Sequence, residues 1–382
     1  MISGTAGAER GVPRPLASRW LDEMPRLAAD ASLASSPLDG GRWFRLADRW
    51  LELVSEDEGL VEELRRNYRD CLVDPPRERD RTIRCRASRL ARSRLLCLSF
   101  SGAHAPEPIL AASTPFRMLR HLARYTAIPG PAPGWQAIVD PDDPGRPLVA
   151  GDRHRLVVDS ERTPEEFASE CVVSVVQGAQ PETLFVHAAS FGVAGAGALL
   201  IGAGHSGKST MSLALAARGH AFLGDDMAAL RTRTGEVVAF ARVMRLRPGP
   251  YVSAFAARLR AIQHEVATGG DGAPRTLVSA GDLFPGSVVQ ALPLRFAFLL
   301  DGFATRPKVT PFRPELLDAA RLKAVVAESL PFWGISPGRD LLKFLDVLNA
   351  LARLDCYRVE LGSPDDSVSA IEEVMEAACR ST

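Results

Sequence analysis

One glycine-rich segment, residues 202–210, has the residue types and spacing of a phosphate-binding loop. It reads GAGHSGKST, and its first part fits G-x-x-x-x-G-K-[ST] in full. The apolar run ALLIG precedes it and a helix-forming run follows it, as the motif requires. Backbone N–H groups of such a loop and of the next helix converge on phosphate oxygens. The sequence therefore predicts a nucleoside triphosphate site here.

Two side chains of this phosphate loop have separate expected roles. Lys208 supplies a positive charge for the β- and γ-phosphates, and the Ser209 hydroxyl is placed to bind Mg²⁺. His205 is unusual in such a loop and either contacts phosphate or points outward. ATP and Mg²⁺ are the expected cofactors. The residues expected to bind the nucleotide are Gly202, Ala203, Gly204, His205, Ser206, Gly207, Lys208, Ser209 and Thr210.

Two adjacent acids, Asp225 and Asp226, follow the apolar run FLG. Ligands of open α/β sheets gather at the carboxyl ends of strands, so the pair is expected to face the phosphates. One carboxylate would hold Mg²⁺, directly or through water, and the other would accept a proton from an attacking hydroxyl. The alternative is a surface turn or a helix cap. His187, one strand upstream, is either a core histidine or part of the site.

The elements that would position these residues alternate between strand and helix, which predicts an α/β domain over residues 179–382. The carboxyl ends of the strands bearing Gly202 and Asp225 should lie side by side, with His187 nearby. Strands are expected over 184–191, 197–202, 220–224, 294–301 and 356–362, a hairpin over 228–241, and helices over 208–218, 314–329, 339–354 and 367–378.

The first half predicts a smaller α+β domain over residues 39–178, preceded by a loose arm over 1–38 with one short helix near 20–29. Thr163 is the expected N-cap of the last helix of this half. Strands are expected over 43–48, 49–56, 81–87, 94–100 and 153–160, helices over 60–72 and 163–179, and a proline-rich loop over 130–150.

Composition limits the function classes. The chain has 382 residues with 46 basic and 46 acidic side chains, and this balance argues against a protein that coats nucleic acid. An arginine-rich run at 77–94 is either a solvated face or a docking patch for an acidic partner. The six cysteines fit neither a zinc module nor a disulfide framework. No signal peptide or membrane span is expected, so a cytoplasmic protein without a membrane partner is predicted.

The block from His187 to the acid pair resembles HPr kinase/phosphorylase and its relatives, and phosphoenolpyruvate carboxykinases share a similar core. The hallmark runs from a histidine-bearing strand, through a glycine-flanked turn and the phosphate loop, to R-G-H and a paired acid. The resemblance covers residues 182–231, about an eighth of the chain. The matching positions are His187, Gly195–Gly197, the phosphate loop, Arg218-Gly219-His220 and Asp225-Asp226.

The resemblance implies a P-loop kinase domain. Lys208 would bind phosphates, Ser209 and Asp226 would contact Mg²⁺, Asp225 would be the base, and His187 would lie near the reacting phosphoryl group. The HPr kinase signature segment after the core is missing, and the N-terminal half is unlike that family. The chain is closer to HPr-kinase-like proteins of bacterial gene clusters, some of which phosphorylate hydroxyls of peptides or small molecules.

Thr210 stands where HPr kinases tend to carry an acid, which leaves the second metal contact open. The arginines of ARVMRLRPG, namely Arg242, Arg245 and Arg247, suit phosphate or carboxylate recognition or are ordinary surface charge.

The leading hypothesis is an ATP-dependent kinase acting on a hydroxyl of a protein, peptide or small molecule, with the N-terminal domain available to bind that acceptor. The alternatives are a nucleotide-binding switch that hydrolyses ATP or GTP, and a degenerate scaffold. The paired acid favours the kinase, since a switch needs a metal site but no base for an alcohol. Homo-oligomer formation is left open.

Overall fold

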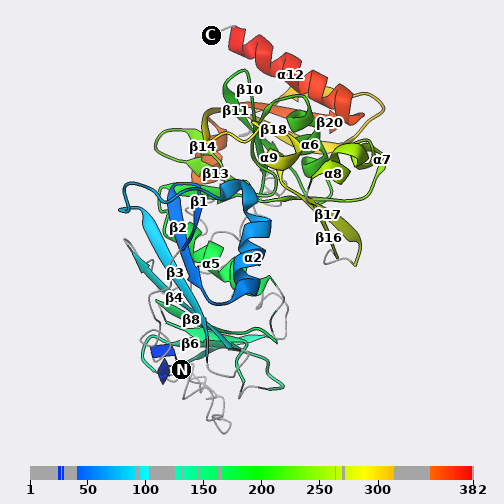
Figure 1. Ribbon diagram of the computed structural model, residues 1–382. Coiled ribbons are helices and arrows are strands. Elements are labelled where there is room, and N and C mark those ends of the chain that lie inside the picture. The colour runs from blue at the N-terminus through cyan, green and yellow to red at the C-terminus, as the bar shows by residue number, and fades with distance from the viewer. Residues whose placement is uncertain are drawn as a thin grey trace, which may run out of the picture.

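The computed structural model describes residues 25–26, 28–29, 41–90, 95–102, 125–130, 132–143, 146–152, 154–161, 163, 166–262, 264–268, 272–313 and 345–380. The fold is a mixed α/β arrangement with several sheets. Figure 1 shows an N-terminal sheet with two helices against it, and a central sheet beyond them that carries the C-terminal helix.

The N-terminal sheet has eight strands in the order β1-β2-β3-β4-β8-β7-β6-β5. Only β2 and β3 pair in parallel among its described strands; the other neighbours are antiparallel. The bounds are β1 Arg42–Leu46, β2 Arg49–Ser55, β3 Thr82–Arg89, β4 Leu95–Gly102, β5 Thr126–Pro129, β6 Gln136–Val139, β7 Val149–Gly151 and β8 Arg155–Asp159.

Two of these strands correct the sequence prediction. Residues 130–150 were expected to form a loop because of their prolines, but β6 lies within them, β7 begins within them, and the two strands pair with each other. The buried side chains of Trp135, Ile138 and Val149 explain the difference, because they pack into the core between the turns that the prolines mark. The expected strands over 43–48, 49–56, 81–87, 94–100 and 153–160 are confirmed with small shifts at their ends.

Two helices pack against this sheet, α2 (Glu58–Asn67) and α5 (Phe167–Gly178). The Asp57 carboxylate caps α2 by accepting a hydrogen bond from the Leu60 N–H at 2.9 Å. The helix ends at Asn67, earlier than expected, and a short 3₁₀ turn η1 (Arg69–Cys71) follows. The expected cap of α5 at Thr163 is wrong, because the helix begins after Glu166.

Three of the eight arginines of the arginine-rich run lie on β3, and two of these pair with an acid of β2 and with the N-cap acid of α2. Arg84 binds Glu52 at 2.6 Å, and Arg89 binds Asp57 at the same distance. Arg84 and Arg89 are therefore already paired with acids of this chain.

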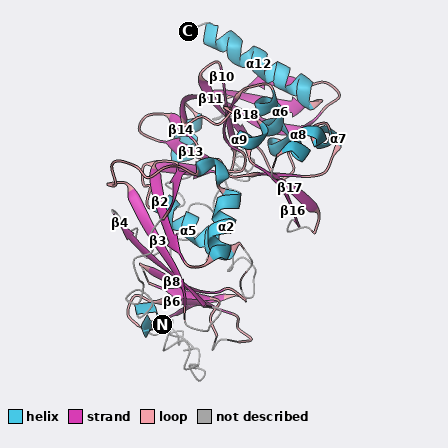
Figure 2. Cartoon of the chain, in the orientation of Figure 1, coloured by secondary structure: helices cyan, strands magenta, loops and turns pink. Residues whose placement is uncertain are grey.

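The central sheet has nine strands, with the order β12-β10-β11-β18-β14-β13-β9; in addition, β20 pairs with β18, and β19 pairs with β20. Figure 2 shows its strands between helices. The bounds are β9 Thr183–Val186, β10 Ala189–Val193, β11 Ala196–Ile201, β12 Ala221–Gly224, β13 Ala228–Arg231, β14 Glu236–Val238, β18 Ala291–Phe303, β19 Lys308–Pro311 and β20 Asp355–Leu361.

Helices cover both faces of the central sheet. On one face, α6 (Lys208–Ala217) and α12 (Pro364–Arg380) form an apolar core with strand residues that include Phe191 and Phe298. On the other face, Val347 and Leu351, from the helical residues 345–351, pack against the sheet. The expected helix over 314–329 lies outside the described residues, as does the first part of the one over 339–354.

The expected strand over 184–191 is wrong as a single element. The chain breaks at His187, so that β9 and β10 belong to different parts of the sheet. The residues on both sides of the break are buried and apolar, and the sequence pattern therefore predicts one continuous strand. The other expected strands, the 228–241 hairpin and the last helix are confirmed with shifted ends.

A third, small sheet extends from the central one in the order β15-β17-β16, with β15 Met244–Leu246, β16 Glu265–Thr268 and β17 Pro274–Val278. Three short helices lie beside it: α7 Pro250–Ser253, α8 Ala256–Ala261 and α9 Ala280–Leu283.

Polar contacts and a shared core join the two halves of the chain. The Arg231 Nε atom donates to Asp48 Oδ1 at 2.8 Å and to Oδ2 at 3.0 Å. The side-chain oxygen of Gln180 accepts a hydrogen bond from the Asp48 N–H at 2.9 Å. One apolar cluster contains both Phe44 of β1 and Phe222 of β12. The two halves therefore pack directly against each other.

All six cysteines are free thiols. Among the described helices, none is long and apolar enough to cross a membrane.

Candidate active site

Three strand ends meet at one edge of the central sheet. The end of β11 leads into the phosphate loop, and β12 ends at Gly224 just before the acid pair. The antiparallel strand β10 lies between them, with Ala189 opposite Leu200 and Ser190 opposite Gly224. The ends of β11 and β12 are thus at the same edge but one strand apart, not side by side as expected. The start of β10 fills the gap and brings His187 to this edge.

The phosphate loop wraps around the amine of Lys208. The Nζ atom donates to the carbonyl of Gly202 at 2.7 Å and to that of Ala203 at 3.1 Å, and the side chain is buried. Gly207, the N-cap of α6, has φ of 101°. The backbone conformation therefore favours glycine, and a Cβ atom there would lie 2.8 Å from Leu361 Cδ1, so that the leucine side chain would have to shift.

His205 has a φ of 68°, in the left-handed region that non-glycine residues rarely adopt. Its Nε2 atom lies 3.1 Å from Nη2 of Arg247, and the residue is exposed. The side chain therefore points away from the loop interior and contacts an arginine. Strained backbone of this kind clusters at ligand-binding sites.

Asp225 is buried next to the start of α6, with 4% of its surface exposed. Burial raises the pKa of its carboxyl to about 6, and the charge of Asp226 adds to that shift. Hydrogen bonding with Ser209 and Ser212 and the charge of Lys208 act in the opposite direction. The Asp225 carboxylate therefore faces the residues that the sequence assigned to phosphate and metal.

Asp226 has the opposite environment. Its side chain is 51% exposed, and its Oδ1 atom lies 3.3 Å from Nδ1 of His187. The His187 side chain is only 16% exposed, so the ring is held at the sheet edge while the carboxylate reaches solvent. The structure thus brings His187, Lys208, Ser209, Asp225 and Asp226 to one edge.

Several polar atoms at this edge are buried without a hydrogen-bond partner in the described part of the chain. They are Asp225 Oδ1, Ser206 Oγ and Ser190 Oγ. Buried polar groups are nearly always paired, so a cluster of unpaired ones is expected where a ligand or ion binds. Ser190 and Ser212 were not predicted as site residues from the sequence, because a single serine in an apolar strand or helix belongs to no recognisable motif.

The donor set suits a hard divalent cation. Mg²⁺ prefers oxygen ligands, keeps several waters and is often bound by one or two carboxylates together with substrate phosphates. Ser209 and the acid pair offer one hydroxyl and two carboxylates. In the described residues there is no group of three or more His, Cys, Asp or Glu side chains that would hold a metal without a nucleotide.

Two of the arginines after the 228–241 hairpin, Arg242 and Arg245, share the partner Glu166. Arg242 Nη2 binds Glu170 at 2.8 Å and Glu166 at 3.3 Å. Burial lowers the pKa of Arg242, but the charge of Glu170 and those of further acids, including Asp226, outweigh it and raise the pKa. Arg245 Nη2 also binds Glu166, at 2.5 Å. Arg242 and Arg245 are therefore carboxylate-bound residues at the junction of the two halves.

The R-G-H segment has a structural role. The side chains of Arg218 and His220 both bind Glu372 of α12, at 2.6 Å and 2.5 Å. They fix the C-terminal helix to the end of α6. This part of the sequence pattern therefore does not contribute to the sheet edge.

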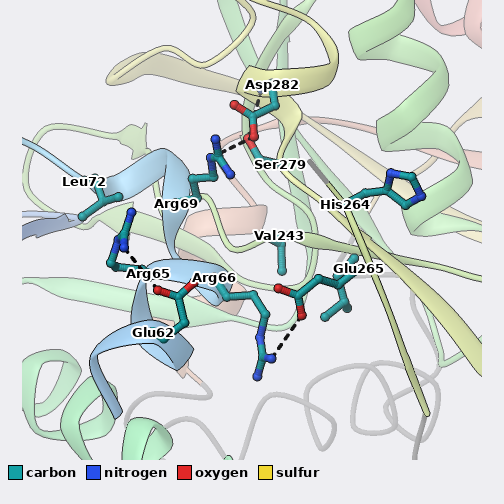
Figure 3. A pocket seen from close by; sticks show the side chains of 11 residues that line it. Glu62, Arg65, Arg66, Arg69, Leu72, Val243, His264, Glu265, Ser279 and Asp282 are labelled. Carbon is teal, nitrogen blue, oxygen red and sulfur yellow. Dashed lines mark hydrogen bonds and ion pairs between the residues drawn. The ribbon is translucent and has the colours of Figure 1, made fainter. Parts of the chain in front are cut away.

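A cavity of about 300 Å³ lies between α2 and the small sheet (Figure 3). Three arginines of α2 and η1 line it, each paired with an acid: Arg65–Glu62 at 3.2 Å, Arg66–Glu265 at 3.1 Å and Arg69–Asp282 at 2.8 Å. None of the predicted site residues lines this cavity. Because its charges are matched internally, it does not compete with the sheet edge as the candidate active site.

Comparisons with known proteins add little. No protein-family model matches the sequence, and no curated protein matches it. Among solved structures, the chain is similar to an HPr(Ser) kinase/phosphatase from Coxiella burnetii, with 15% identity, 52% of this chain and 97% of that chain covered, and a TM-score of 0.26. A structural similarity this low does not indicate a shared function. The function is therefore inferred from the residues at the sheet edge.

Proposed function

We propose that this protein is an ATP-dependent kinase that transfers the γ-phosphoryl group to a hydroxyl of a protein, peptide or small molecule. The observation that carries the proposal is the buried Asp225 carboxylate, with an unpartnered Oδ1 atom, beside the Lys208 amine at the start of α6. A phosphate grip next to a carboxylate of raised pKa is the combination that phosphoryl transfer to an alcohol needs.

In the proposed reaction the acceptor oxygen attacks the γ-phosphorus atom as the bond from that phosphorus to the β,γ-bridging oxygen breaks. The acceptor proton moves to Asp225, and the products are the phosphorylated acceptor and ADP. Lys208 and the N–H groups at the start of α6 stabilise the charge on the phosphate oxygens. His187 would orient Asp226, since its Nδ1 atom lies 3.3 Å from Oδ1 of that carboxylate.

We propose Ser209 and Asp226 as the protein ligands of Mg²⁺. The half-exposed Asp226 carboxylate can bind a hydrated cation without first being drawn from a buried site. When bound, Mg²⁺ would neutralise charge on the β- and γ-phosphates. The remaining loop residues would bind the phosphates through their backbone.

A second division of roles also has an observation in its favour. Ser209 hydrogen-bonds with Asp225, which would let Asp225 support the metal site while the more exposed Asp226 takes the proton. In both versions the two acids have different roles, because their burial and partners differ.

We propose that residues 39–178 form the acceptor-binding part and residues 179–382 the nucleotide-binding part, with residues 1–38 as an arm. Arg242 supports this arrangement, because it binds Glu166 and Glu170 and also interacts with the charge of Asp226. An acceptor placed along the N-terminal half would therefore reach the acid pair from the junction. The protein is proposed to act in the cytoplasm.

The competing function is a nucleotide-binding switch that hydrolyses ATP or GTP. The test is incubation with γ-labelled ATP and Mg²⁺ together with candidate acceptors, followed by separation of labelled acceptor from free phosphate. We expect acceptor labelling that disappears in Asp225→Asn. Release of labelled phosphate with no labelled acceptor would contradict the kinase and favour the switch.

A further inference from the structure

An aromatic ring stands exposed beside the phosphate loop. Phe303, the last residue of β18, is 69% exposed, more than any other large apolar side chain in the described part of the chain. Single apolar residues at a surface are ordinary, so exposure alone says little. Phe303 is nevertheless a candidate functional residue, because it lies next to the loop that is proposed to hold a triphosphate.

The strand pairing brings Phe303 to the loop. β18 is the parallel neighbour of β11, with Leu299 opposite Ile201, so both strands end at the same edge. A Cβ atom at Gly207 would lie 3.8 Å from Cε1 and Cζ of Phe303. The ring is therefore next to the N-cap of α6, where the phosphate chain of a nucleotide would rest.

The end of β18 is shaped to hold the ring in this place. The pairing of β18 with β20 shifts register between Leu300 and Phe303, and Phe303 pairs with the buried Leu361. Gly302, directly before it, has φ of 107°. Irregularities of this kind re-aim side chains next to functional sites.

The order of the strands gives the direction of the nucleotide. The acid pair follows β12, on one side of β11, while β18 lies on the other side. A triphosphate whose γ-phosphate faces Asp225 runs across the loop toward β18. Its ribose and base then leave the loop on the side where Phe303 stands.

We infer that Phe303 is the stacking platform for the base of the nucleotide, an inference that rests on the proposed nucleotide-binding function. An aromatic face binds any base through its π-system, and large flat ring systems gain most from such contact. ATP and GTP should both bind through this contact, and more tightly than UTP or CTP.

The test compares two probes, Mg·ATP and Mg·tripolyphosphate, which share phosphates and differ in the nucleoside. Calorimetry would measure the Kd of both for wild type, Phe303→Ala, Phe303→Tyr and the control Val266→Ala. Val266 is 67% exposed on β16 of the small sheet. We expect Phe303→Ala to weaken ATP roughly 5- to 100-fold and to leave tripolyphosphate unchanged. Phe303→Tyr and Val266→Ala should bind both probes like wild type.

Two results would overturn the inference while leaving the proposed function intact. One is an unchanged ATP affinity in Phe303→Ala. The other is an equal loss for ATP and tripolyphosphate, which would mean that the ring supports the loop rather than the base. If wild-type protein binds neither probe, the proposed function fails and the inference fails with it.

Discussion

The Nδ1 atom of His187 lies 3.3 Å from the Oδ1 atom of Asp226, whereas Asp225, the preceding residue, is buried beside Lys208. Two adjacent carboxylates therefore have different neighbours and different exposure. The pKa of Asp225 is raised by burial, and the charge of Asp226 contributes to that rise. This asymmetry gives the two acids different roles in the proposed kinase reaction.

Replacing Lys208 with alanine should weaken ATP binding and remove most transfer. The amine is buried at the loop, where it would face the phosphates of a bound nucleotide, and loss of one preorganised charge or donor costs roughly 10²–10³ in rate. Arg233→Ala, which removes a 78% exposed charge in the 228–241 hairpin, is the control and should change neither. Unaltered ATP affinity in a folded Lys208→Ala protein would contradict the phosphate-loop assignment.

The two acids should give different kinetic phenotypes. If Asp225 is the base, Asp225→Asn should keep ATP binding and lose transfer roughly 10²–10⁴-fold at every Mg²⁺ concentration. Asp226→Asn should lose activity in a way that added Mg²⁺ partly restores. Titrations of Mg²⁺ against transfer rate measure both. If Asp226→Asn instead loses transfer at every Mg²⁺ concentration and added Mg²⁺ partly restores Asp225→Asn, the second division of roles is supported. Near-normal transfer in both variants would exclude the kinase.

The transfer rate should fall below about pH 6, because the base must be deprotonated and the pKa of Asp225 is about 6. The γ-phosphate also titrates near this pH, so the wild-type profile needs an internal comparison. Asp226→Asn at saturating Mg²⁺ provides one, since removing its charge lowers the pKa of Asp225 while both proteins bind the same Mg·ATP complex. The acidic limb of kcat should therefore move to lower pH in Asp226→Asn. A limb at the same pH in both proteins would assign it to the nucleotide.

Much of this site could be predicted because its signals are local. The loop at Gly202 needs glycines and a lysine at fixed spacing, and the acid pair follows a short apolar strand, so each is visible in a few residues. The break at His187 could not be predicted, because the flanking residues are apolar on both sides and only the pairing of β10 with β11 and β12 separates it from β9.

The junction between the halves is a product of long-range packing. The contact of Arg231 with Asp48 joins residues far apart in the sequence, and nothing near either residue indicates the partner. Pro133 and Pro141 lie in turns, as expected, but the proline-rich composition hid β6 and β7, whose burial depends on the rest of the sheet. Local composition therefore predicts turns in this region, whereas the formation of its strands depends on pairing with the rest of the sheet.

A buried acid of α2, Glu63, which contacts Ser169 of α5, should make stability depend on pH. Burial raises the pKa of Glu63 to about 7 from an ordinary value of 4.5, hydrogen bonding with Ser169 opposes the rise, and Glu166 adds to it. The folded protein then binds a proton that the unfolded chain has lost. Stability from this group is complete below pH 4.5 and is lost as the pH rises to 7.

Glu63→Gln should therefore stabilise the protein above pH 7, by about 3 kcal/mol at most, and flatten the free energy of unfolding between pH 4.5 and 7. Urea denaturation across this range measures the effect. Glu62→Gln, on the same helix and 60% exposed, is the control and should leave the pH dependence as in wild type. If Glu62→Gln changed the pH dependence of the free energy of unfolding as Glu63→Gln does, the assignment to Glu63 would be contradicted.

Because β10 and β11 are antiparallel neighbours, the turn that joins them and the phosphate loop that follows β11 lie at opposite ends of these strands. The β10–β11 hairpin turns at Ala194 and Gly195, at the end of these strands remote from the phosphate loop. A Cβ atom at Gly195 would meet nothing within 4 Å. This turn is therefore a natural point at which to insert a tag or a fluorescent reporter, since the chain can be lengthened there without altering the spacing of His187, Gly202 and Asp225.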